Sequence, residues 1–265
     1  MLMPRSGWFR SVSHAAVLLL AASHAAAETS RPVQFGVEAG GGFAGLELAD
    51  FDKAASDNGG TVEPAGWTGG ARAIVQLSMG LGVSVGYLAE GGGRYENTIT
   101  GYNKKKDASI TRTIVATYEQ TVYPFSVHFR KTFDRVALGG EVGIDVTSAT
   151  VHYTEMDSQG DSLRGDLGDQ GIGYHAAAEG ALRLGGGVWG WLRLGYSALS
   201  LDNFSGTVDE NGTFKPESLF MVKESGTGLE QLEVSTSNSV TSSDHRPARV
   251  SGAGIRFTAG LRLLF

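Results

Sequence analysis

The chain has 265 residues, of which 39 are glycine and none is cysteine. The lack of cysteine excludes disulfides and cysteine-based metal or nucleophile chemistry, so the stability of the protein must come from the fold itself. The formal net charge of −6 argues against a nucleic-acid partner, because proteins that bind nucleic acids favour a basic surface.

The first residues have the features of a secretory signal peptide. Arg5 and Arg10 form a basic start, the apolar run AAVLLLAA follows, and Ala25-Ala26-Ala27 offers a cleavage site. The apolar run is much shorter than the ~20 residues that a membrane-spanning helix needs. We therefore predict a signal peptide over residues 1–27 and a single mature domain over residues 28–265.

The mature chain is dominated by alternation with period two, which is typical of β-strands because successive side chains point to opposite faces. In the first such run, Phe35 and Val37 alternate with Gln34 and Glu38. The last run, GIRFTAGLRLLF, ends on the terminal Phe265. The alternation predicts eight strands, at residues 33–48, 66–78, 81–94, 110–129, 136–147, 172–184, 191–198 and 254–265.

The connections between these strands alternate between long and short. Short turns are predicted at residues 79–80, 131–135 and 185–187. The long connections comprise a polar loop at 51–64, the loop that holds Lys104-Lys105-Lys106, an acidic loop at 155–171, and a segment at 202–249 in which further strands could form. This pattern is typical of bacterial outer-membrane barrels, which have periplasmic turns and longer extracellular loops.

The alternating final strand that ends on Phe265, together with GIGYHAAAEGALRL from Gly171 to Leu184, resembles the small OmpA/OmpX-type outer-membrane β-barrel family. The resemblance implies an eight-stranded antiparallel up-and-down transmembrane β-barrel in the bacterial outer membrane. The final strand should pair with the first strand to close the barrel. We expect a monomer that contacts outer-membrane lipid and lipopolysaccharide and engages the barrel-assembly machinery through the strand ending at Phe265.

Charged residues occupy the face of the strands that should point into the barrel. Because a barrel of eight strands has just enough room for side chains, these charges should pair and fill the lumen. The alternative is a gated, low-conductance ion path through rearranged pairs. The predicted lumen charge network comprises Glu38, Arg72, Glu90, Arg94, Glu141, Asp145, His175, Glu179, Arg183, Arg193, Arg256 and Arg262. Arg130 and His128 are expected on the same face.

Ser126 and His128 lie two apart on one strand and therefore share a face, as a nucleophile and its base must. Outer-membrane lipid-modifying enzymes use serine and histidine, which makes the pair a candidate. Against this reading, the pair points into the lumen near the periplasmic rim and has no evident third residue. We therefore interpret it as lumen packing, and we predict no catalytic, cofactor-binding or metal-binding residues.

The long loops carry weaker signals. The acidic segment offers oxygen ligands but lacks the spacing of a calcium loop, and Lys104-Lys105-Lys106 could attract anionic lipopolysaccharide. The leading hypothesis is a non-enzymatic surface protein that presents these loops for interaction or envelope integrity, because recognition is usually placed on loops held by a rigid scaffold. A small gated channel and a lipid-modifying enzyme are the alternatives.

Overall fold

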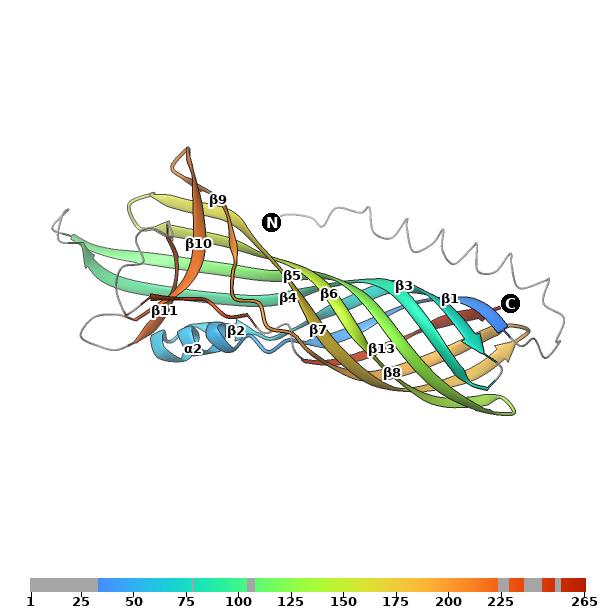
Figure 1. The fold of residues 1–265 in the computed structure, drawn as a ribbon. Coiled ribbons are helices and arrows are strands. Elements are labelled where there is room, and N and C mark those ends of the chain that lie inside the picture. The colour runs from blue at the N-terminus through green and yellow to red at the C-terminus, as the bar shows by residue number, and fades with distance from the viewer. Residues whose placement is uncertain (1–32, 78, 104–107, 224–228, 236–244, 251–253) are drawn as a thin grey trace.

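The computed structural model describes residues 33–265 except 78, 104–107, 224–228, 236–244 and 251–253 (Figure 1). The predicted signal peptide and the Lys104-Lys105-Lys106 run therefore lie outside the described residues. Where the chain is described, none of its helices has the length and apolar character that crossing a membrane requires.

Eight strands form a closed antiparallel ring. Along the ring they are β1 (Val33–Gly45), β3 (Ala65–Leu77), β4 (Leu81–Asn103), β5 (Ala108–Phe133), β6 (Val136–Asp157), β7 (Ser162–Gly185), β8 (Val188–Ala198) and β13 (Gly254–Leu264). The last strand, β13, pairs with both β8 and β1, which closes the ring as the sequence predicted. The pairing of β1 with β13 places Glu38 directly opposite Arg262.

Short turns join the ring strands at one end, which we call the turn end, and the C-terminus lies there too (Figure 1). Backbone hydrogen bonds between Phe35 and Phe265 fix that terminus to the start of β1. The turn between β3 and β4 contains Gly80 at φ 88°, a left-handed conformation that glycine adopts without steric cost. The predicted short connections are therefore confirmed.

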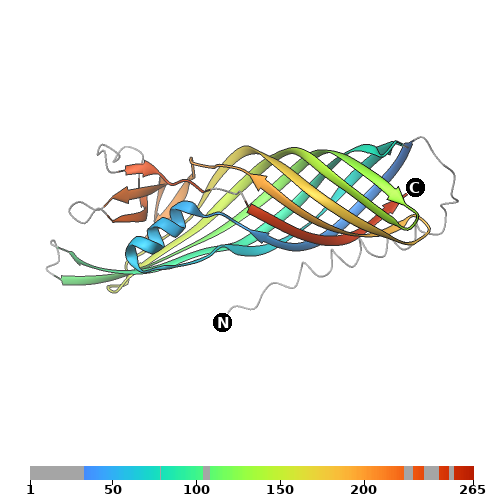
Figure 2. The ribbon, with the colours of Figure 1, turned by 90° about the horizontal axis from the view of Figure 1, so that it is seen from below.

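At the opposite end, the long connections are folded into what we call the cap. It consists of α2 (Ala49–Asn58), β2 (Thr61–Glu63), β9 (Ser205–Glu210), β10 (Thr213–Lys223), β11 (Glu230–Ser235), β12 (His245–Pro247) and the outer parts of β4 to β7. Together with the ring, these strands make one sheet of 13 strands. Figure 2 shows α2 lying along the extended sheet.

Two predicted loops in this region were wrong. The polar segment 51–64 contains most of α2, because Phe51, Ala54 and Ala55 recur at helical spacing and are buried on one face. The acidic segment 155–171 belongs to β6 and β7, which continue to a tight turn after Asp157. By contrast, segment 202–249 contains short strands, as the sequence allowed.

The cap has a hydrophobic core of its own. Phe51 of α2 packs against Tyr95 of β4, with ring centroids 5.8 Å apart. Tyr118 of β5 meets Phe204 edge to face, with ring centroids 6.4 Å apart. Leu219, Met221 and Leu232 from β10 and β11 complete the same cluster. Within the cap, the face of β4 to β7 that points inward is therefore predominantly apolar, with Asn97 as a buried polar exception.

Within the ring, the arrangement of polar and apolar residues is reversed. On β5, the inward positions are apolar in the cap, at Ile114, Ala116 and Tyr118, but polar in the ring, at Ser126, His128 and Arg130. The outward positions of the same strand change in the opposite sense. Tyr123, Phe125, Val127 and Phe129 are exposed in the ring, whereas Thr113, Thr117 and Glu119 occupy outward positions in the cap.

Candidate functional site in the ring interior

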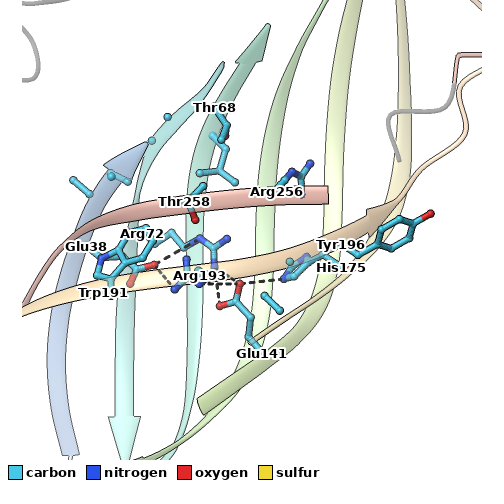
Figure 3. A pocket seen from close by; sticks show the side chains of 18 of the residues that line it. Glu38, Thr68, Arg72, Glu141, His175, Trp191, Arg193, Tyr196, Arg256 and Thr258 are labelled. Atoms are coloured by element: carbon cyan, nitrogen blue, oxygen red, sulfur yellow. Dashed lines mark hydrogen bonds and ion pairs between the residues drawn. The ribbon is translucent and has the colours of Figure 1, made fainter. Parts of the chain in front are cut away.

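The ring interior is filled by charged side chains that alternate with the exposed apolar residues along each strand. Five carboxylates and five guanidinium groups gather there. The charges of the described interior residues therefore sum to zero when the histidines are neutral. Figure 3 shows several of them pointing toward one another from different strands. These residues are Glu38, Glu90, Glu141, Asp145 and Glu179 with Arg72, Arg130, Arg193, Arg256 and Arg262.

Glu179 on β7 is the centre of the network. Its carboxylate accepts hydrogen bonds from Arg130 at 2.8 Å, from Arg193 at 2.7 Å, and from Arg262 at 2.7 and 2.8 Å. Arg193 and Arg262 also donate to Glu38, so the two carboxylates share two guanidinium groups. Such charge-assisted bonds are stronger than neutral ones and fix the geometry of both partners.

Two further ion-pair groups flank this centre. Arg72 donates from Nη1 to both carboxylate oxygens of Glu141, at 2.8 and 2.9 Å. Arg256 lies nearer the cap, with its Nε 2.6 Å from Glu90 and its Nη1 3.3 Å from Asp145. The ion pairs therefore extend through the interior from the β1–β13 seam toward the cap.

The structure places the predicted network together except for two members. The prediction that Arg94 lies in the interior was wrong, because its side chain points outward, pairs with Glu96 at 2.6 Å and is 46% exposed. A β-bulge between Gly91 and Gly93 shifts the register of β4 and reverses which face the following residues occupy. Arg183 lies at the turn end, where its Nε donates to the carbonyl oxygen of Gly186 at 3.1 Å.

Ser126 makes a contact that the sequence did not suggest. Its hydroxyl lies 2.9 Å from His175 Nε2, and His175 Nδ1 lies 2.8 Å from Asp145 Oδ1. The predicted partner, His128, is buried without a hydrogen bond on its Nε2. Ser126, His175 and Asp145 thus form a hydrogen-bonded Ser–His–Asp series, which is the arrangement of serine hydrolases, although all three side chains are buried.

Ser126 and His175 meet because of a glycine. They lie on β5 and β7, and both pair with Gly143 on the intervening strand β6. A Cβ atom at residue 143 would lie only 2.6 Å from His175 Cε1. The glycine therefore leaves the space that lets the histidine ring reach across β6 to the serine.

Apolar side chains lie on both sides of the ion pairs. On the cap side the hydrophobic core described above lies over the ion pairs. Toward the turn end, Trp191 packs with Ala137 and Ala181, and Trp189 packs against this cluster. Two small cavities lie among the described residues of the polar interior, with volumes of about 40 and 10 Å³.

The cap carries polar contacts that hold its parts together. Arg246 of β12 donates to both oxygens of Asp50 in α2, at 2.6 and 2.8 Å. These hydrogen bonds raise the pKa of Arg246 above its ordinary value. Burial raises the pKa of the Glu233 carboxyl; His245 and Arg112 oppose this rise, and Glu155 adds to it.

The acidic segment that was considered for calcium is used structurally. Asp157 accepts hydrogen bonds from the backbone N–H groups of Gln159 and Asp161, which shapes the β6–β7 turn. Asn211, at the β9–β10 turn, exchanges two hydrogen bonds with Ser162 at the start of β7. Within the described ranges, no group of three or more His, Asp or Glu residues is arranged to hold a metal ion.

Comparisons with known proteins point to a fold and to no family. No family model matches the chain, and a search of curated proteins finds no match. Among solved structures, the chain is similar to the crystal structure of a major outer membrane protein from Thermus thermophilus, with a TM-score of 0.50 and 14% sequence identity. The match covers 89% of this chain and 100% of the other. At this identity the likeness extends to the fold alone.

Proposed function

We propose that the protein is a bacterial outer-membrane protein whose eight-strand ring is a transmembrane β-barrel and whose cap is a non-enzymatic interaction module at the cell surface. The observation that carries the proposal is the reversal of polarity between ring and cap. A side chain faces lipid most favourably when it is apolar, and the exposed face is predominantly apolar along the ring, whereas exposed apolar side chains such as Phe214 are few in the described part of the cap.

The dimensions and composition of the ring support a membrane location. Strands β8 and β13 each have 11 residues, and a tilted transmembrane strand needs ~9–11. Exposed aromatic residues lie toward both ends of the apolar band, as in the aromatic girdles of membrane barrels. They are Trp67, Tyr87, Tyr123, Tyr174 and Tyr196 toward the cap and Phe35, Phe129, Phe133 and Phe265 toward the turns.

The cap supports the surface role. It is a folded unit held on a rigid ring, and binding residues are commonly placed on such a scaffold. The β6–β7 and β9–β10 hairpins are predominantly acidic, with Asp157, Asp161, Asp166, Asp169, Asp209 and Glu210 against Arg164 and Lys215. Lipid and lipopolysaccharide would surround the ring, the barrel-assembly machinery would engage β13 and Phe265, and the chain would act as a monomer.

Because the chain has no cysteine, single-thiol variants test its orientation directly. Phe214→Cys in the cap replaces a residue that is 72% exposed, and Arg135→Cys is at the turn end. With a membrane-impermeant maleimide, Phe214→Cys should be labelled on intact cells, whereas Arg135→Cys should need a permeabilised outer membrane. The reverse labelling would place the cap inside, and recovery of the protein in the soluble fraction without detergent would refute the membrane assignment.

The channel hypothesis has less support than the surface role. Glu179 and Glu38 are each paired with more than one guanidinium group, and apolar clusters lie on both sides of the ion pairs. We therefore expect no stable openings in planar bilayers for the purified protein. Stable openings that change with Glu179→Gln would instead support a channel.

The Ser126–His175–Asp145 series is a specific observation in favour of the lipid-modifying alternative. This series is a better catalytic candidate than the Ser126–His128 pair because it includes a carboxylate that orients the histidine. Its burial opposes this function, because a lipid ester could not reach the hydroxyl without displacing the surrounding ion pairs. Lipid A and phospholipid turnover should be unchanged in Ser126→Ala cells, and a loss of turnover would favour the enzyme.

A further inference from the structure

The larger cavity lies inside the ring, among the ion pairs. Its volume is about 40 Å³, and its lining includes Arg72, Glu141, Trp191, Arg193 and Ala177 (Figure 3). A cavity needs about 10–15 Å³ of such volume to hold one water molecule. The space is therefore large enough for a very small polar guest and too small for an organic ligand.

Three buried N–H groups that belong to residues lining this cavity have no hydrogen-bond acceptor among the described residues. They are Arg72 Nε, Arg193 Nε and the indole Nε1 of Trp191. Each of the three side chains is more than nine-tenths buried. A buried donor without a partner costs about 1–3 kcal/mol, so three of them around one cavity indicate that the cavity supplies an acceptor.

The neighbouring carboxylates make no hydrogen bond to either guanidinium Nε. Arg72 Nε lies 3.8 Å from Glu38 Oε1, and Arg193 Nε lies 3.5 Å from Glu141 Oε1. A water molecule in the cavity beside such a pair can accept from the nitrogen and donate to the oxygen. Both carboxylates have other guanidinium donors, but their oxygens can accept an additional hydrogen bond.

The charge balance decides which acceptor fits. With His128 and His175 neutral, the five interior carboxylates are matched by five guanidinium groups, so an anion such as chloride would enter a neutral space with no cation left to compensate it. A buried charge without a partner costs several kcal/mol. Water accepts the same hydrogen bonds without adding charge.

We propose that the cavity between Arg72, Trp191 and Arg193 is a built hydration site that holds one or more ordered water molecules, which bridge these donors to the carboxylates of Glu38 and Glu141. The site goes beyond the proposed surface function and does not depend on the cap. It makes water a structural member of the ion-pair network rather than part of a path across the membrane.

The decisive variants are a pair of isosteres at Ala177, which lines the cavity. Valine and threonine have nearly the same shape, so overpacking affects both Ala177→Val and Ala177→Thr, but only threonine brings a hydroxyl that can accept from the orphan donors. The control pair is Ala178→Val and Ala178→Thr, on the outward, lipid-facing side of the same strand.

In detergent, Ala177→Thr should unfold at a higher temperature than Ala177→Val, whereas the order at residue 178 should favour valine. Valine equal to or more stable than threonine at residue 177 would overturn the proposal. A crystal structure of the unmodified protein, soaked in sodium bromide, should show water density within hydrogen-bonding distance of the three donors and no anomalous bromide peak. An empty cavity or a bromide ion there would also overturn it.

Discussion

Glu179→Gln is the substitution that tests the ionic interior most directly. The carboxylate accepts hydrogen bonds from Arg130, Arg193 and Arg262, and its side chain is 7% exposed. Glutamine keeps the shape and one carbonyl acceptor, but it removes the charge and leaves a buried positive excess. Removing one partner of a buried pair costs about 3–5 kcal/mol, so the unfolding equilibrium should shift by roughly two to four orders of magnitude.

The matched control is Glu96→Gln, which breaks the exposed pair with Arg94. An exposed ion pair contributes about 0.2–1 kcal/mol. Both variants would be unfolded in denaturant from the same detergent or vesicles, with tryptophan fluorescence as the signal. A double variant, Glu179→Gln with Arg262→Met, should recover part of the loss because it restores the charge balance. Equal costs for Glu179→Gln and Glu96→Gln, or no recovery in the double variant, would refute this account.

Three further predictions concern packing, backbone strain and pH. Gly260→Ala should destabilise the ring by about 1–3 kcal/mol, because the added Cβ would lie 2.6 Å from the Trp191 ring. The control, Gly180→Ala, would place its Cβ 3.9 Å from the nearest atom and should be nearly neutral in the same denaturant titration. Gly92→Ala should cost about 1–3 kcal/mol because residue 92 has φ 110°, and an unchanged midpoint would show that the bulge does not need this conformation. Because the pKa of Glu233 is raised in the folded protein, this carboxyl stabilises the fold at pH values below the ordinary glutamate pKa. The contribution is lost as pH rises through the raised pKa. The free energy of unfolding of the unmodified protein, relative to that of Glu233→Gln, should therefore fall over this pH interval. A pH-independent difference would contradict this assignment.

The ring could be predicted from the sequence because its signals are local. Alternation along each strand and the length of each turn do not depend on residues elsewhere in the chain. Arg94 was misplaced because a single extra residue at the Gly91–Gly93 bulge reverses the alternation, and a run of glycines does not reveal where the bulge lies. The sequence therefore predicted a continuous strand here and gave no sign that the inward face changes after the bulge.

The folded cap was missed for a different reason. Its polar and acidic residues are the outward half of a pattern whose inward half is apolar, as with Val151 and Tyr153 on β6. The composition of the segment suggested a loop, although the alternation continued through Tyr153. In α2, the spacing of Phe51, Ala54 and Ala55 was a helical signal within a short polar segment.

The contact of Ser126 with His175 depends on tertiary register. The residues are 49 positions apart and lie on strands that are separated by β6. Once the registers are known, Gly143 between them indicates a close approach. Without the registers, the nearest histidine in sequence, His128, was the only partner that could be nominated.

The ionic interior has a role that an apolar one could not fill in a membrane. In water, a shift of one residue in strand register is costly because it moves apolar side chains into solvent. In lipid, a ring with apolar residues on both faces would tolerate such a shift, because either face could meet hydrocarbon. In the proposed barrel, a shift on β13 would carry Arg262 from Glu38 and Glu179 toward the outer face and bring Leu261 or Leu263 inward. Although a buried ion pair often adds little net stability compared with apolar residues, this one makes the alternative registers unfavourable, so it specifies which face of the sheet is the interior.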